Sequence, residues 1–79
     1  MKDRIRQVID EHGQLSVPVG ELEDGADLYA AGMTSHASVN VMVALEDSFD
    51  VEFPDSMLNR EVFESIASIA AALEAIEAS

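Results

Sequence analysis

The C-terminal run of apolar residues is the feature that most narrows what this chain can fold into. Between residues 66 and 76 apolar side chains recur every three or four positions, at Ile66, Ile69, Ala70, Leu73 and Ile76. That spacing places them along one side of an α-helix. Ser65 directly precedes the run, and its hydroxyl can cap the first helical turn. The sequence therefore predicts a final helix that packs its apolar side against other helices.

Three further segments have helical character. Residues 3–12 carry apolar residues at i, i+3 and i+4 and are followed by a glycine, and residues 55–63 predict another short helix. Residues 35–49 predict the longest helix, about 22 Å at 1.5 Å per residue. No segment alternates convincingly as a strand, so we expect an all-α bundle of three or four helices. The residues expected to form its core are Val39, Met42, Leu45, Phe49, Ile66, Ile69 and Leu73.

The segment between residues 14 and 34 has no sustained period and is strongly acidic. A loop of this length in a compact domain is usually functional. We expect its apolar residues to pin it onto the core, with Leu28 and Tyr29 forming one helical turn after Asp27. The acidic residues between 21 and 27 lack the spacing and the closing glutamate of a calcium loop, so we expect a solvated loop and no metal site.

Size and charge restrict the partners and the setting. The chain has 79 residues, and we expect one domain spanning residues 1–79. Sixteen acidic residues against four basic ones give a net charge of −12, which disfavours nucleic acid and anionic membranes and favours basic protein partners. Without cysteine there can be no disulfide or thiolate metal site, and no signal peptide or membrane span is visible. We expect a cytoplasmic monomer.

The junction at residues 32–39 is the candidate functional stretch. Ser35 opens a helical run, so its hydroxyl lies at a helix N-terminus, where N–H groups are unpaired and negative charge is favoured. Such a serine can carry a phosphodiester, but a Ser or Thr at this place is most often only an N-cap, and these residues alone leave both interpretations open. Ser35 and His36 are adjacent, so their side chains diverge on a helix, and no nucleophile-elbow motif surrounds them. We expect no enzyme activity.

Nearly the whole chain resembles the acyl/peptidyl carrier protein family. The resemblance rests on residues 27–35 (DLYAAGMTS), 41–49 (VMVALEDSF), 51–54 (VEFP) and 63–66 (FESI). It implies an acyl-carrier-like four-helix bundle with a long first loop and a short third helix. The chain departs from the family pattern on both sides of the serine. Thr34 stands where the family usually has Asp or His, and His36 where it usually has Leu, Ile or Met.

By this resemblance, Ser35 is the attachment point of 4′-phosphopantetheine, whose thiol carries an acyl or aminoacyl group as a thioester. The implied function is that of a stand-alone carrier protein that delivers this group to partner enzymes. The implied partners are a phosphopantetheinyl transferase, an adenylating enzyme that loads an acyl or aminoacyl group, and downstream acyl-using enzymes. The predicted partner-binding residues are His36, Asn40, Val43, Ala44, Glu46, Asp47 and Phe53.

Polar residues around the serine favour a small cargo. Dehydrating Thr34, His36, Ser38 and Asn40 for a hydrocarbon tail would be costly, so we expect a short acyl or aminoacyl group rather than a fatty chain. The alternative function is an unmodified acidic helical module that binds a basic partner protein through its second helix. His36 itself leaves a second interpretation open, that of a partly exposed helix residue without a special role.

Overall fold

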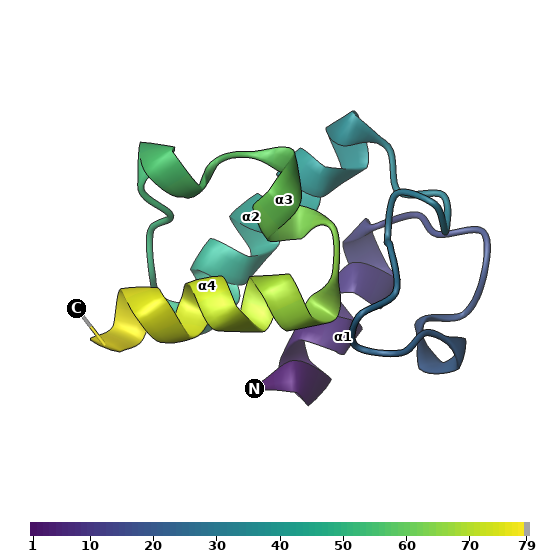
Figure 1. Cartoon of the computed structure of the whole chain (residues 1–79), viewed down its shortest axis with the longest axis horizontal. Coiled ribbons are helices and arrows are strands. Elements are labelled where there is room, and N and C mark those ends of the chain that lie inside the picture. Colours follow the sequence, from purple (N-terminus) through teal and green to yellow (C-terminus); the bar gives the residue numbers. More distant parts are fainter. Residues whose placement is uncertain (79) are drawn as a thin grey trace.

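The structure describes residues 1–78 of the chain, which form four α-helices and two 3₁₀ turns joined by loops. The structure is a computed structural model, and Ser79, the last residue of the predicted domain, lies outside the described residues. The elements are α1 (Lys2–His12), η1 (Val19–Glu21), α2 (Ser35–Phe49), η2 (Asp55–Met57), α3 (Arg60–Phe63) and α4 (Ile66–Ala78) (Figure 1). The predicted all-α four-helix fold, with a long first loop and a short third helix, is confirmed.

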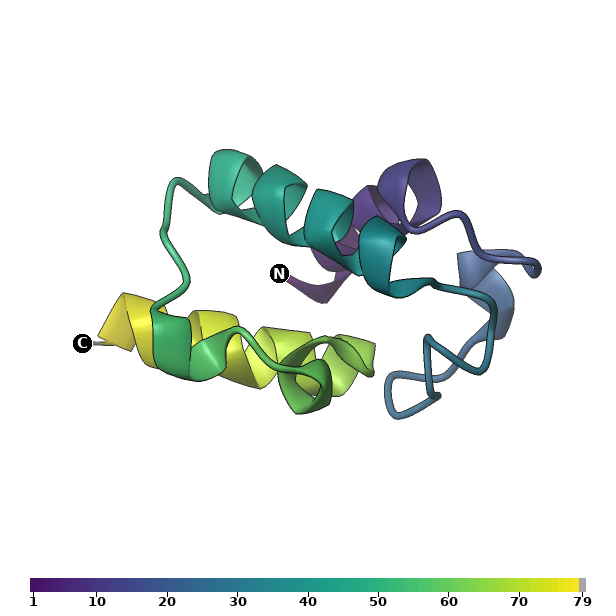
Figure 2. The ribbon, with the colours of Figure 1, turned by 90° about the horizontal axis from the view of Figure 1, so that it is seen from above.

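Helix α2 begins and ends where the sequence predicted, because both ends are capped. Thr34 has an extended backbone, and its Oγ1 accepts a hydrogen bond from the N–H of Ala37 at 3.0 Å. At the other end Asp50 adopts a left-handed conformation with φ +54°, and its N–H donates to the carbonyl of Glu46. Figure 2 shows α2 on one side of α3 and α4, with the long loop at one end. No helix within residues 1–78 is long and apolar enough to cross a membrane.

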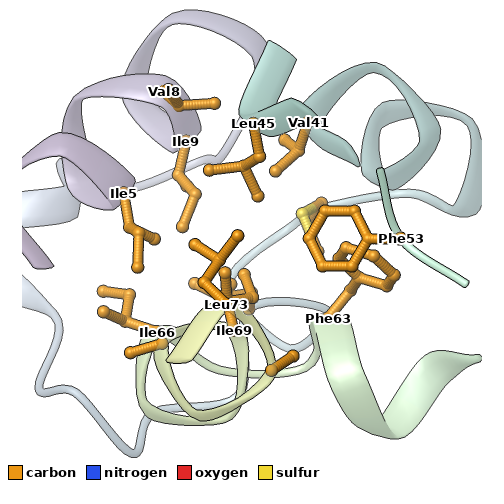
Figure 3. Packing of buried hydrophobic residues seen from close by; sticks show 14 of the residues in the cluster. Ile5, Val8, Ile9, Val41, Leu45, Phe53, Phe63, Ile66, Ile69 and Leu73 are labelled. Carbon is orange, nitrogen blue, oxygen red and sulfur yellow. The ribbon is translucent and has the colours of Figure 1, made fainter. Parts of the chain in front are cut away.

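The core lies between α1, α2 and α4 (Figure 3). Leu45, Ile66, Ile69 and Leu73 are fully buried, as predicted. The prediction for Val39 was wrong, because this side chain is 53% exposed. The buried α2 residues step by four, at Ala37, Val41 and Leu45, whereas Met42 and Phe49 lie half-buried beside them.

The predicted helix over residues 55–63 is divided in two. Leu58 and Asn59 separate η2 from α3, and Asn59 is extended, with φ −142° and ψ 165°. Its side-chain oxygen accepts a hydrogen bond from the N–H of Val62 at 3.1 Å, which makes Asn59 the N-cap of a new helix. The prediction of one continuous helix was wrong because Asn59 caps a new helix within that range.

The long loop is fastened to the helices by Asp24. Its carboxylate accepts from Arg6 at 2.7 Å and from Lys2 at 3.0 Å, both on α1, and its carbonyl accepts from the N–H of Ala67 on α4. The hydrogen bond from Arg6, followed by that from Lys2, holds the pKa of the Asp24 carboxyl below its ordinary value. This partly exposed cluster joins α1, the loop and α4.

The end of the loop is also fixed, just before α2. The N–H of Ala31 donates to the carbonyl of Asp27, which forms the predicted helical turn. The N–H and Oγ of Ser16 both donate to the carbonyl of Ala31, at 2.9 and 2.8 Å. Gly32 follows with φ +114°, and a Cβ there would lie 2.8 Å from the Oγ of Ser16. Glycine is therefore required for the turn that delivers the chain to Ser35.

Candidate functional site

Ser35 is the first residue of α2, and it is exposed. Thr34 supplies the helix cap, so Ser35 is not needed for that purpose. The hydroxyl of Ser35 makes no hydrogen bond to any residue in the range 1–78. Of the two interpretations of this junction, the N-cap applies to Thr34, and the Ser35 hydroxyl is free for chemistry.

Two backbone donors lie next to that hydroxyl. The N–H groups of Ser35 and His36 have no acceptor among the described residues, whereas the N–H groups of Ala37 and Ser38 donate to Thr34. Unpaired N–H groups and the dipole at a helix N-terminus favour a bound anion. The start of α2 can therefore accommodate negative charge at Ser35.

A cleft of about 280 Å³ opens beside Ser35, between α2 and the segment that leads into α3. Most of its walls are apolar or aromatic. Besides Ser35 it is lined by Tyr29, Ser38, Val39, Met42, Leu58, Asn59, Arg60 and Phe63. The guanidinium carbon of Arg60 lies 4.1 Å from the centroid of the Tyr29 ring, which is a cation–π contact. The cleft thus combines an apolar interior with one cation.

A second, larger groove of about 590 Å³ runs along the opposite side of α2, where α2 meets α1. Four of the predicted partner-binding residues line it together with residues of α1. The groove is formed by Val8, Glu11, His12, Asn40, Val43, Ala44, Asp47 and Ser48. His36 is exposed one helical turn before Asn40. The predicted partner-binding residues include the α2 wall of this groove but none of its α1 wall.

Glu46 and Phe53 lie elsewhere. The Glu46 carboxylate accepts a hydrogen bond from the N–H of Phe53 at 2.8 Å, and Glu46 is half-buried. Phe53 is only 3% exposed and packs edge-on against Phe63, with ring centroids 5.3 Å apart (Figure 3). Its side chain is therefore core rather than partner surface, and Glu46 holds the connector after α2 in place. Among the predicted partner residues, these two have structural tasks.

The polarity argument for the cargo was also partly wrong. The hydroxyl of Thr34 is occupied as a cap, and Asn40 lines the groove rather than the cleft. The Ser38 hydroxyl lines the cleft but already donates to the carbonyl of Ser35 at 2.7 Å. Of these polar groups, Thr34 and Ser38 are thus paired and Asn40 lies on another side of α2, while His36 is exposed and does not line the cleft.

Neither Arg60 nor Tyr29 was predicted to belong to the functional site. Arg60 is the only basic residue after position 6, and Tyr29 is the only tyrosine. An arginine so far from the other three basic residues, in a chain of net charge −12, is a signal that could have drawn attention to residue 60. Its closeness to Ser35 could not have been read from the sequence, because it depends on the fold of the 50–59 connector.

Comparisons with known proteins agree with this geometry. Residues 3–73 match the family model described as "Phosphopantetheine attachment site". The aminoacyl carrier protein of Agrobacterium fabrum (strain C58 / ATCC 33970) is 51% identical over 69 residues, which cover 87% of this chain and 83% of that relative.

Two solved structures show the same fold. The first is a complex of an engineered Bradyrhizobium japonicum glycine:[carrier protein] ligase with the carrier protein from Agrobacterium tumefaciens and AMP. A chain of this complex superposes with a TM-score of 0.91 at 47% identity, and the match covers 94% of the present chain and 99% of that chain. The second is a complex of the Bradyrhizobium japonicum glycine:[carrier protein] ligase with glycylated carrier protein. A chain of this complex gives a TM-score of 0.77 at 27% identity, and the match covers 90% of the present chain and 95% of that chain.

The fold and the exposed serine at the start of α2 are those of a small helical carrier, a substrate of enzymes rather than an enzyme. The match over residues 3–73 and the 51% identity show that the chain belongs to the phosphopantetheine-attachment family of carrier proteins. Its prosthetic group is phosphopantetheine. Membership in this family replaces the alternative of an unmodified acidic interaction module.

The residues at the start of α2 fit a phosphopantetheine arm. Ser35 offers an exposed hydroxyl without a hydrogen-bond partner, and two unpaired N–H groups lie beside it. The adjoining cleft is open to solvent at Ser35 and has apolar walls.

Within residues 1–78, no three His, Asp or Glu side chains gather closely enough to hold a metal ion.

Proposed function

We propose that residues 1–79 form a single carrier domain in which Ser35 accepts 4′-phosphopantetheine. The observation that carries this assignment is the free Ser35 hydroxyl, left without a structural task because Thr34 caps the helix. The fixed turn at Gly32 presents this hydroxyl at the start of α2. When attached, the arm supplies a terminal thiol that holds the cargo as a thioester. The protein itself binds, orients and presents that arm.

The cargo we propose is an aminoacyl group, with glycine as the first candidate. Support comes from the relatives, because one is named an aminoacyl carrier protein and another was solved in its glycylated form with a glycine:[carrier protein] ligase. The loading enzyme would then be an adenylating ligase of that kind. A short cargo remains in water, so it does not depend on the cleft beside Ser35.

The partner surface we propose is the acidic groove between α1 and α2. Asp47 and Glu11 provide its negative charge, and the half-exposed Val43 provides an apolar contact. This combination suits a basic patch with an apolar centre on the phosphopantetheinyl transferase, the loading ligase and the downstream acyl-using enzymes. We further propose that the carrier works as a cytoplasmic monomer and does not engage nucleic acid or membranes.

Arm attachment is tested by incubating the protein with a broad-specificity transferase and coenzyme A and measuring the intact mass. Wild type and Ser38→Ala should each gain one phosphopantetheine, and Ser35→Ala should gain none. Ser38 is the matched control because it is the next serine along α2 and lines the same cleft. Full labelling of Ser35→Ala would overturn the assignment.

Cargo is tested on the arm-bearing protein. With the Bradyrhizobium ligase, ATP and glycine, the mass should rise by one glycyl group. Hydroxylamine should then remove this group, because hydroxylamine cleaves thioesters. Loading by fatty acids with an acyl-activating enzyme, combined with no loading by any amino acid, would contradict an aminoacyl cargo.

A further inference from the structure

Arg60 occupies an unusual place for a cation in this protein. It is the only basic residue after position 6, and it lines the cleft that contains Ser35. The other three bases lie on α1 and are engaged elsewhere. Lys2 and Arg6 bind Asp24, and Arg4 donates to the Ser48 hydroxyl at 3.2 Å.

The guanidinium of Arg60 is held, but its donors are not used. Its carbon lies 4.1 Å from the Tyr29 ring centroid, and no hydrogen bond or ion pair joins the Arg60 side chain to another residue in the range 1–78. Stacking on an aromatic ring uses the face of a guanidinium and leaves the N–H groups along its edge free. This is notable because sixteen acidic side chains are available in the chain, yet none is paired with Arg60.

We infer that Arg60, positioned by Tyr29, binds the phosphodiester that joins the arm to Ser35. The inference rests on the proposed attachment at Ser35. A phosphodiester there adds one negative charge to a molecule that already carries −12, so a nearby cation has a clear electrostatic role. The planar fork of an arginine also matches the geometry of two phosphate oxygens.

Arg60 would act together with the start of α2. Ser35 and His36 supply two unpaired N–H groups at the start of α2, and Arg60, on α3, lines the same cleft as Ser35. Pairing across the cleft directs the root of the arm towards α3. Arg60 is a positioning residue in this role, because the chemistry of the carrier takes place at the far end of the arm.

The test uses wild type, Arg60→Gln and Arg4→Gln, each carrying the arm as verified by intact mass. Arg4→Gln is the matched control, because it removes the same charge near Ser48, about 20 Å along α2 from Ser35. The ³¹P resonance of each protein is followed from about 0.01 M to about 1 M salt, over which the Debye length falls from about 30 Å to about 3 Å. The Arg60 Nε–Hε resonance is compared before and after arm attachment.

The expected result is a ³¹P shift that changes with salt in wild type and in Arg4→Gln but no longer changes in Arg60→Gln. The Arg60 Nε–Hε resonance should move when the arm is attached and stay in place when Ser35→Ala is treated in the same way. If the mass gain occurs but ³¹P behaves identically in all three proteins, Arg60 does not bind the phosphodiester. If wild type gains no mass, it is the attachment at Ser35 that fails, which is a separate result.

Discussion

The two hollows on either side of α2 differ in chemistry. The cleft towards α3 holds the free serine, apolar walls and one cation, Arg60, whereas the groove towards α1 carries the acids Glu11 and Asp47. A protonated aminoacyl group is repelled by the cation of the cleft and attracted by the acids outside it. A basic partner is attracted to the groove. In the proposed function, the same helix therefore separates the side that receives the arm from the side that meets the partner.

This separation requires a helix with three faces. Ala37, Val41 and Leu45 face the core, Val39 and Met42 face the cleft, and the third face lines the groove. Each face contains apolar side chains, because apolar residues of α2 line the cleft and the groove as well as the core. The apolar pattern of α2 consequently has no single dominant stripe, and this explains why Val39 was wrongly assigned to the core.

The largest expected effect is a loss of stability from a substitution on the core face of α2. Leu45→Ala should lower the free energy of unfolding by about 2–5 kcal/mol, because it empties a fully buried site. Val39→Ala, on the cleft face, should change it by less than about 0.5 kcal/mol. Urea denaturation measures both. Equal losses for the two variants would mean that the faces of α2 have been assigned incorrectly.

The next effect separates the two acids near the end of α2. Glu46→Ala leaves the N–H of Phe53 without its acceptor, which should cost about 1–2 kcal/mol. Asp47→Ala is the neighbouring control and should change stability by less than about 0.5 kcal/mol. Glu46→Gln retains an acceptor oxygen and should lie between them. If Glu46→Ala were as stable as wild type, Glu46 could be returned to the partner surface.

A smaller effect is expected on partner encounter. Asp47→Lys should slow arm transfer by a basic transferase about three- to tenfold at low salt, mainly through the association rate, while the melting temperature stays unchanged. Glu77→Lys makes the same charge change on α4 and is exposed, so it serves as the control. Equal slowing by both variants would indicate a general charge effect and not docking at the groove.

The smallest effect is the change in stability at low pH that comes from Asp24, Arg6 and Lys2. These residues line neither the cleft nor the groove. Since Arg6 and Lys2 lower the pKa of Asp24 in the folded protein, its ionised form stabilises the fold fully above about pH 4, and this contribution disappears as the pH falls through the lowered pKa. Asp24→Asn should therefore melt below wild type at pH 6, and this difference should narrow as the pH falls to 2.5. A constant difference across this range would contradict the expectation.

Much of this architecture could be predicted from the sequence, and the remainder depended on contacts between distant segments. The bounds of α2 were predictable because Thr34 is a local cap and the apolar-proline loop follows directly. Ser35 stood out by its local motif. The roles of Glu46 and Arg60 could not be predicted, because each depends on where the 50–59 connector returns against α2. Phe53 looked like an exposed loop residue until its packing on Phe63 was known.

The central claim is that Ser35 holds the arm and an aminoacyl group in the cell. The most direct test is mass spectrometry of the protein isolated from its native host, with fragmentation of the peptide that contains Ser35. We predict phosphopantetheine on Ser35, bearing an aminoacyl group in part of the molecules. Unmodified Ser35 in all molecules, or the arm on a different serine, would contradict it.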